Sequence, residues 1–136
     1  MNSNPAQTGS APRPRWMIVD DDNDLLLLLD AVLAKTNDVE IFCFNNGPDA
    51  CAAFAQAPDS FEFVITDLEM PDMNGLELQR RLRSLSPELK ILLMTGNRNY
   101  TEQMAATSGF CGLLRKPFLL ASLADVLTSA GGRNNL

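Results

Sequence analysis

The stretch WMIVDDDNDLLLLLD, residues 16–30, joins an apolar run to three consecutive aspartates and then to five consecutive leucines. Two ionised carboxylates about 4 Å apart repel each other by roughly 4 kcal/mol at an effective dielectric constant near 20. A fold therefore retains adjacent acids only where water solvates them fully or where a positive charge lies among them. The residues that neighbour these acids in the fold decide between the two environments.

Short apolar runs alternate along the chain with segments of helical periodicity. We predict strands at 16–19, 39–44, 61–66, 91–94 and 110–114, and helices at 23–35, 48–57, 75–85, 99–107 and 119–130. Several strands are apolar at successive positions, as expected of a sheet that is covered on both faces. Five strands alternating with five helices predict an α/β fold with a parallel sheet and right-handed crossovers.

The composition fits one soluble domain. The 136 residues suffice for a proper core, and 46% of them are hydrophobic while 21% are charged. The net charge of −6 and the scattered lysines and arginines argue against direct binding of nucleic acid or of an anionic membrane. Histidine is absent from the sequence and the three cysteines lack metal-ligand spacing, so we expect reduced thiols in a cytoplasmic protein. No apolar run in the sequence is long enough to span a bilayer.

Polar side chains follow four of the predicted strands. The acids at 20–22 follow the first strand, Asp67 the third, Thr95 the fourth and Lys116 the fifth. Ligands of open parallel sheets bind outside the carboxyl ends of the strands. We therefore expect these side chains to face one crevice, which holds a cation and a phosphoryl group.

Four fragments carry these residues: VDDDN at 19–23, ITDLEMPDMNG at 65–75, MTG at 94–96 and RKPF at 115–118. In this order and spacing they closely resemble the receiver domain of bacterial two-component response regulators. The resemblance implies a doubly wound, flavodoxin-like fold with strand order 2-1-3-4-5 and five helices. We expect a receiver domain at 15–130, between a flexible N-terminal tail at 1–14 and a C-terminal tail at 131–136.

The resemblance implies a role for each residue of the crevice. Asp67 matches the phosphoacceptor, Thr95 the hydroxyl that binds the phosphoryl group, and Lys116 the lysine that pairs with it. Chemistry supports these roles, because a carboxylate can act as a nucleophile and form an aspartyl-phosphate. Phosphoryl transfer needs positioning and positive charge more than acid–base groups.

The resemblance also implies a Mg²⁺ (or Mn²⁺) site. Asp21 matches the acid that binds the metal directly, Asp20 the acid that holds a metal-bound water, and Asp67 is itself a ligand. Glu69 occupies the position whose backbone carbonyl is the third protein ligand. Its side chain alternatively points to solvent and tunes the attack of water on the phosphoryl group. Magnesium prefers oxygen ligands and is satisfied by one or two carboxylates plus phosphate oxygens.

The implied function is that of a phosphorylation-operated signalling module. It takes a phosphoryl group from a histidine kinase or a histidine phosphotransfer protein onto Asp67, loses it by hydrolysis, and switches its binding to a downstream protein effector. It is not an enzyme beyond its own phosphorylation and dephosphorylation. The fourth and fifth predicted helices contain only Glu102 and Asp125 as charged residues, which favours a monomer or weak dimer.

Two other functions remain as alternatives. A haloacid-dehalogenase-like phosphatase also uses an aspartate nucleophile, magnesium and a lysine, but its nucleophile closes the first strand, whereas Asp67 closes the third. A degenerate receiver would bind partners without being phosphorylated. The main argument for it is Leu113, which stands where relatives carry the Tyr or Phe that turns inward on phosphorylation. Leucine has no ring to turn, so we expect output coupling by that route to differ.

The leucine run lies in the helix predicted at 23–35. Helical spacing assigns to its buried face Leu25, Leu28, Leu29, Val32 and Leu33. Leu26 and Leu27 then face solvent. Such a pair can be without function, or it can be a docking patch for the histidine-bearing helix of a partner, which the family meets near this helix.

Two backbone features complete the expectations. Gly75 is predicted to take a positive φ where the loop after the third strand turns into its helix. The resemblance implies a cis peptide between Lys116 and Pro117.

Overall fold

The computed structural model describes residues 13–131, so the predicted tails at 1–14 and 131–136 lie largely outside the described residues. The strands are β1 (Arg15–Val19), β2 (Glu40–Phe44), β3 (Phe61–Asp67), β4 (Lys90–Thr95) and β5 (Gly112–Arg115). The helices are α1 (Asn23–Asn37), α2 (Gly47–Gln56), α3 (Gly75–Leu85), α4 (Glu102–Thr107) and α5 (Leu120–Ser129), with a short 3-10 helix, η1 (Pro58–Ser60), before β3.

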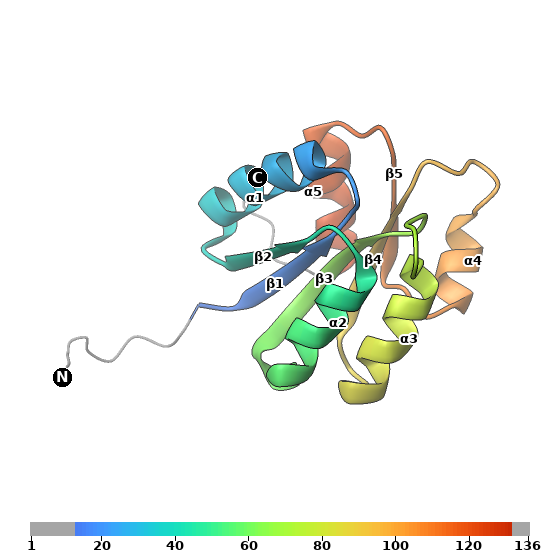
Figure 1. Cartoon of the computed structure of the whole chain (residues 1–136). Helices are drawn as coiled ribbons and strands as arrows, with labels where there is room; N and C mark the ends of the chain where they lie inside the picture. The colour runs from blue at the N-terminus through green and yellow to red at the C-terminus, as the bar shows by residue number, and fades with distance from the viewer. Residues whose placement is uncertain (1–12, 132–136) are drawn as a thin grey trace.

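The strands form one parallel sheet in the order β2-β1-β3-β4-β5, which confirms the predicted architecture. Helices α1 and α5 cover one face of the sheet, and α2, α3 and α4 cover the other (Figure 1). The strand order reverses between β1 and β3, where the chain leaves β1 for one edge and returns for the other. Their carboxyl ends therefore flank the crevice in which such sheets bind ligands.

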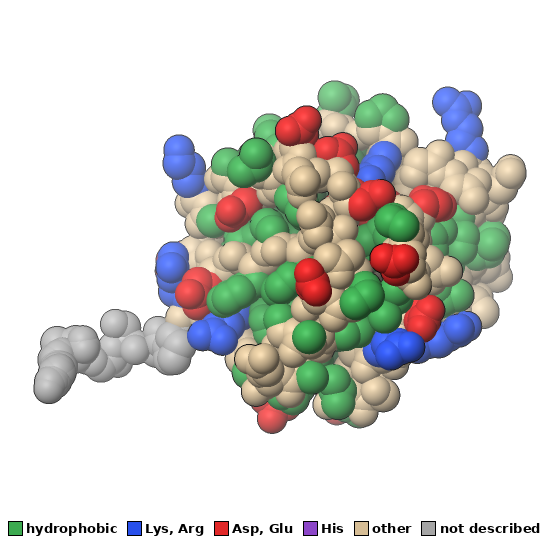
Figure 2. Space-filling model, viewed as in Figure 1, with side chains coloured by type: hydrophobic (Ala, Val, Ile, Leu, Met, Phe, Trp, Pro, Cys, Tyr) green, Lys and Arg blue, Asp and Glu red, His purple; other side chains and the backbone are tan. Residues whose placement is uncertain are grey.

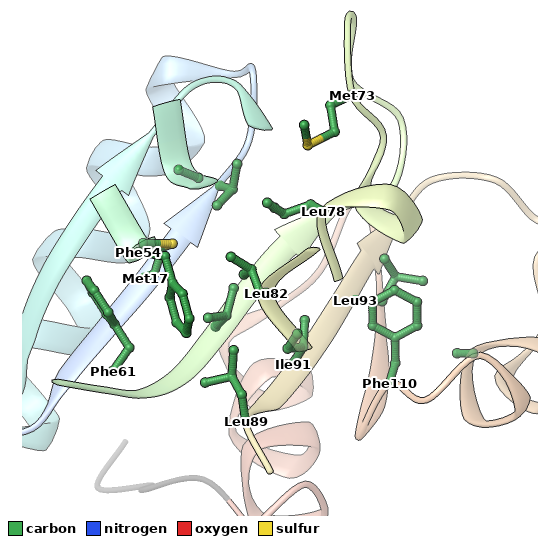
Figure 3. Close-up of a cluster of buried hydrophobic side chains, with 14 of the residues drawn as sticks. Met17, Phe54, Phe61, Met73, Leu78, Leu82, Leu89, Ile91, Leu93 and Phe110 are labelled. Atoms are coloured by element: carbon green, nitrogen blue, oxygen red, sulfur yellow. The ribbon is translucent and has the colours of Figure 1, made fainter. Parts of the chain in front are cut away.

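Strand β1 shows why the sheet has two separate cores. Trp16 and Ile18 pack on the side of α1 and α5, while Met17 and Val19 pack on the side of α2, α3 and α4. All four side chains are fully buried, because successive residues of a strand point to opposite faces. Figure 3 shows the second of these cores, in which Met17 lies near Phe54, Phe61 and Leu82.

Helix α1 buries a different leucine stripe from the one that we predicted. Leu26, Leu29 and Leu33 are buried, whereas Leu27 is 70% and Leu28 is 50% exposed. The assignments of Leu26 to solvent and of Leu28 to the core are therefore wrong. Five consecutive leucines satisfy the helical spacing in more than one rotation, so the pattern could not fix which stripe faces the sheet.

The start of one helix differs from its predicted position. Helix α4 begins at Glu102 rather than at 99, because the Thr101 side chain caps it by accepting the N–H of Met104 at 3.0 Å. The Lys116–Pro117 peptide is cis, as the resemblance implied. Within residues 13–131, every helix is too short or too polar to cross a bilayer.

On the side shown in Figure 2, lysine and arginine side chains lie singly or in small groups, separated by acidic and hydrophobic side chains.

Gly75, at the start of α3, is required for space and not for a positive φ. The positive-φ glycines of the described residues are Gly109 and Gly131, so the predicted conformation of Gly75 is wrong. A Cβ at this position would clash with the carbonyl oxygen of Asp67 and lie 3.1 Å from Cα of Leu68. The first turn of α3 thus packs directly against the backbone that ends β3.

We expect Gly75→Ala to destabilise the protein by about 1–3 kcal/mol, because the added methyl group would force apart the backbones of α3 and β3. Gly96→Ala is the matched control, since its nearest neighbours would be atoms of Lys116 at 3.8 and 3.9 Å. Urea unfolding measures both. Equal stability of the two variants would contradict the steric explanation.

Candidate functional site

Three acids converge at the carboxyl edge of the sheet. Asp67 is the last residue of β3, and Asp20 and Asp21 follow β1, the neighbouring strand. One carboxylate oxygen of each acid lies within 4.8 Å of the others. Asp20 and Asp67 are buried, whereas Asp21 is exposed. Three carboxylates at this spacing offer the oxygen ligands that Mg²⁺ or Mn²⁺ prefers.

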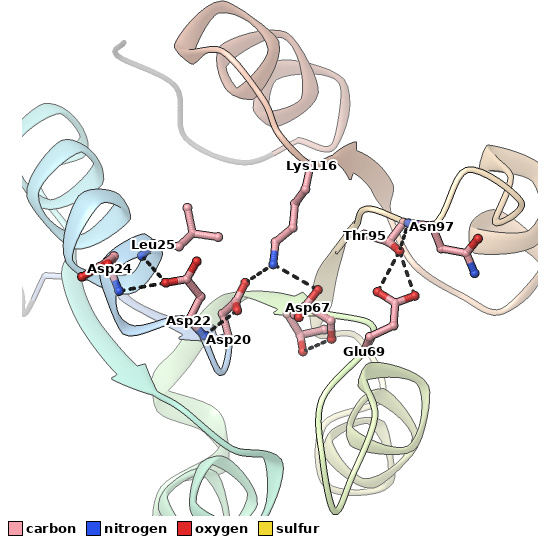
Figure 4. A network of polar contacts seen from close by, with 10 residues as sticks. Asp20, Asp22, Asp24, Leu25, Asp67, Glu69, Thr95, Asn97 and Lys116 are labelled. Atoms are coloured by element: carbon pink, nitrogen blue, oxygen red, sulfur yellow. Dashed lines mark hydrogen bonds and ion pairs between the residues drawn. The ribbon is translucent and has the colours of Figure 1, made fainter.

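Lys116, which directly follows β5, supplies a positive charge among these acids. Its Nζ lies 2.6 Å from Oδ2 of Asp20 and 3.3 Å from Oδ1 of Asp67, as Figure 4 shows. Both oxygens are buried, and neither accepts a hydrogen bond from any other group of the described residues. The consecutive acids of the first loop are thus retained beside a cation, and not by solvation alone.

Each of the three consecutive aspartates has a different position. Oδ1 of Asp20 accepts the N–H of Asp22 at 2.9 Å, which fixes the Asp20 carboxylate at the crevice. Asp22 caps α1, because its carboxylate accepts the N–H groups of Asp24 and Leu25 at 3.0 and 3.3 Å. Asp21 keeps its exposed carboxylate next to the buried pair.

The buried carboxylates are strained electrostatically. Burial first, and then the charge of Asp20, raise the pKa of Asp67 to about 6, although Lys116 acts to lower it. Burial likewise raises the pKa of Asp20, against the hydrogen bond from Lys116. Burial acts to lower the pKa of Lys116, but its contacts with Asp20 and Asp67 outweigh burial and raise it. One ammonium therefore does not fully compensate two buried acids.

A second polar network lies on the other side of Asp67. Thr95, the last residue of β4, is buried, and its Oγ accepts the N–H of Asn97 at 3.0 Å. The same oxygen lies 3.0 Å from each carboxylate oxygen of Glu69. The Glu69 side chain is exposed, as one of our two alternatives allowed, and its carboxylate also lies against Thr95 (Figure 4). Its carboxylate is not part of the acidic cluster. The metal role of its backbone carbonyl stays a prediction.

Two contacts in this region could not be predicted from the sequence. One is the hydrogen bond between Glu69 and Thr95. The other is made by Arg115, which donates to the carbonyl oxygens of Asn97 at 3.2 Å and Tyr100 at 2.6 Å and so holds the loop between β4 and α4. Each contact joins a loop to the end of a neighbouring strand, and no residue spacing encodes how the two approach each other.

Leu113, which stands where relatives carry Tyr or Phe, is a core residue. Leu113 in β5 is buried in the core that also contains Phe110, Leu93 and Ala105. Tyr100, from the loop before α4, packs partly buried against the same core. Leu113 and the ring of Tyr100 thus belong to the same side of the sheet, together with Phe110.

Comparison with known proteins gives one consistent family. The family model of the response regulator receiver domain matches residues 16–128. The response regulator receiver protein CpdR of Brucella abortus is 37% identical over 82 residues, which cover 60% of this chain and 66% of CpdR. Three other curated regulators match over about a quarter of their own length, so the chain spans only part of these relatives.

Solved structures show the same fold. The chemotaxis response regulator CheY4 of Vibrio cholerae has a TM-score of 0.76 and 26% identity, over 87% of this chain and 98% of CheY4. The receiver domain of Ssk1, in its co-crystal with the histidine phosphotransfer protein Ypd1 of Saccharomyces cerevisiae, has a TM-score of 0.73 and 19% identity. That match covers 90% of this chain and 92% of the other.

The raised pKa of Asp67 predicts a pH-dependent effect of Asp67→Asn. The folded protein holds the Asp67 proton up to about pH 6, against an ordinary value of 3.8, so the stability linked to this proton is present at low pH and lost as the pH rises through about 6. The variant, which cannot ionise, should equal the wild type near pH 4 and exceed its stability by about 2 kcal/mol at pH 8.

Urea unfolding between pH 4 and pH 8, with a chelator present, measures this difference. Asp125→Asn, which removes an exposed carboxylate of α5, controls for the loss of one negative charge. A stability difference between Asp67→Asn and wild type that is the same at every pH would refute the assignment.

Proposed function

Because the chain belongs to the response regulator receiver family, we propose that it accepts a phosphoryl group on Asp67 from a phosphohistidine of a partner protein and later loses it by hydrolysis. The observation that carries this proposal is the meeting of the Asp20, Asp21 and Asp67 carboxylates with the Lys116 ammonium at one edge of the sheet. No separate acid or base is required, since phosphoryl transfer depends on positioning and charge.

The proposed transfer is a displacement at phosphorus. A carboxylate oxygen of Asp67 attacks the phosphorus atom, the new O–P bond forms as the P–N bond to the histidine breaks, and the electron pair stays on the ring nitrogen. The histidine leaves as a neutral imidazole when its other nitrogen carries a proton. In hydrolysis, water attacks the same phosphorus atom, the O–P bond to Asp67 breaks, and inorganic phosphate and the free carboxylate result.

The acidic cluster fits a divalent cation. The buried oxygens Oδ2 of Asp20 and Oδ1 of Asp67 have only Lys116 as a partner among the described residues, so negative charge remains to be balanced. Asp20, Asp21 and Asp67, with the backbone carbonyl of Glu69, would hold Mg²⁺ or Mn²⁺. The ion supplies positive charge that draws phosphoryl oxygens toward Asp67 and offsets the charge that develops during transfer.

Lys116 and Thr95 would then bind the oxygens of the phosphoryl group. The Lys116 ammonium, which bridges two acids in this structure, is close enough to Asp67 to pair with a group bound there. Thr95 ends the strand next to Asp67 and offers its hydroxyl from the opposite side. The family match leaves no observation that favours a haloacid-dehalogenase-like phosphatase, while a degenerate receiver differs from our proposal in the chemistry of Asp67.

Incubation with acetyl phosphate tests the acceptor. We expect intact-mass analysis to show one added phosphoryl group on the wild type with Mg²⁺, and none on Asp67→Asn or in the presence of a chelator. Phosphorylation of Asp67→Asn at the wild-type level would show that another residue is the acceptor. An unmodified wild type would support the degenerate receiver. Release of far more than one equivalent of phosphate per chain from a phosphomonoester would support the phosphatase.

The exposed leucines of α1 are the proposed docking patch for the histidine-bearing partner. The patch consists of Leu27 and Leu28, in place of the pair Leu26 and Leu27 that we predicted. Leu28 also lines a hollow of about 420 Å³ together with Lys116 and Phe118, so this side of the patch extends to the lysine of the acidic site. An apolar surface beside the acceptor is what a helix carrying the phosphohistidine requires.

Replacing both Leu27 and Leu28 by glutamate should slow transfer from a phosphorylated histidine phosphotransfer protein at least about tenfold, since charged residues would be buried in the interface. Phosphorylation by acetyl phosphate should stay unchanged, because the small donor needs no docking. Leu85→Glu, at an exposed leucine at the far end of α3, is the matched control. Equal slowing with both donors would show that the double substitution damages the acceptor and not docking.

A further inference from the structure

The hydroxyl of Thr95 is already engaged in the free protein. A threonine hydroxyl has one hydrogen to donate and can also accept. Its accepting side is used by the N–H of Asn97, and its hydrogen has the Glu69 carboxylate as an acceptor at 3.0 Å. While the hydrogen points to Glu69, it is unavailable to any group bound at Asp67.

The geometry favours this engaged state. Thr95 is fully buried, so its hydroxyl is shielded from solvent, whereas its acceptor Glu69 belongs to the exposed loop after β3. Hydrogen bonds to an ionised carboxylate are stronger than those between neutral groups. Both carboxylate oxygens of Glu69 lie at the same distance, so a small rotation of the carboxylate leaves an acceptor in place. The Thr95 hydroxyl is also the one hydrogen-bond partner of the Glu69 carboxylate among the described residues.

The two polar networks of the site are separate. Lys116 joins Asp20 to Asp67, and Glu69 joins only to Thr95 (Figure 4). Glu69 reaches Thr95 from the loop after β3, whose Leu68 donates its N–H to the carbonyl oxygen of Met94 at 2.9 Å. This backbone bond holds the loop beside the end of β4, so the Glu69 carboxylate stays within reach of the hydroxyl.

We propose that Glu69 is a positioning residue that holds the Thr95 hydroxyl away from Asp67, so that an oxygen of a phosphoryl group on Asp67 must displace the Glu69 carboxylate to bind Thr95. The inference rests on the proposed function and concerns the threonine contact alone. Glu69 therefore weakens the loaded state of the site and favours the free state. Its effect depends on Thr95, which distinguishes it from simple repulsion between Glu69 and an anion.

A double-mutant cycle separates these two effects. The probe is beryllofluoride with Mg²⁺, whose affinity is measured by titration calorimetry for wild type, Glu69→Ala, Thr95→Ala and the double variant. Glu69→Ala retains the backbone carbonyl of residue 69. We expect it to bind the probe about fivefold to tenfold more tightly than wild type when Thr95 is present, and with unchanged affinity when position 95 is alanine.

Glu88→Ala is the matched control, because it removes an exposed carboxylate before the opposite end of β4. It should leave the affinity unchanged. Glu69→Gln, whose amide oxygen can still accept from Thr95, should lie between wild type and Glu69→Ala and serves if the alanine variant folds poorly. An equal gain from Glu69→Ala in both backgrounds, or no gain at all, overturns the proposal.

A second measurement needs no cation. The amide N–H of Asn97 donates to Oγ of Thr95, so its NMR signal reports the state of that oxygen. In cation-free protein, Glu69→Ala should move this signal toward its position in the beryllofluoride complex of the wild type; an unmoved signal counts against the proposal.

If the wild type binds no beryllofluoride, the proposed function fails, and the Asn97 signal still tests the contact between Glu69 and Thr95. If the wild type binds it and the cycle is additive, only the role of Glu69 fails.

Discussion

One ammonium group shared by two buried carboxylates is the interaction on which this site depends. Without Lys116, the carboxylates of Asp20 and Asp67 would face each other across a buried crevice with no compensating charge in the described part of the chain. Breaking a buried ion pair by removing one partner is far more costly than losing a surface pair. The three residues come from the ends of β1, β3 and β5, so the sheet order must be right before any of them is useful.

This dependence links the fold to the chemistry. Parallel strands bring their carboxyl ends to one edge, and the order β2-β1-β3-β4-β5 places the strands that carry the acids side by side. The first turn of α3 packs against the backbone of Asp67 through Gly75, which has no side chain. Asp67 is therefore held by packing at its backbone and by charge at its carboxylate.

The sheet and most residues of the site could be predicted from the sequence, because the site residues follow the strands directly. The acids at 20–22, Asp67, Thr95 and Lys116 sit at strand ends, and strand ends of a parallel sheet must meet. Predictions failed where several arrangements satisfied the same pattern. Five consecutive leucines fit two rotations of α1, and a glycine at a helix start is compatible with either a positive φ or a tight contact. The partner of Glu69 depends on how the loop after β3 approaches the end of β4. In each case the deciding contact is tertiary.

Asp22, which caps α1, has a consequence beyond the stability of the helix. Its backbone N–H donates to the Asp20 carboxylate, and its own carboxylate accepts the N–H groups of Asp24 and Leu25. Asp22 therefore connects the acidic cluster to the first turn of α1. The exposed Leu27 and Leu28 lie between one and two helical turns after Asp22. A protein that binds these leucines would thus meet the acidic cluster at a distance set by the contacts of Asp22.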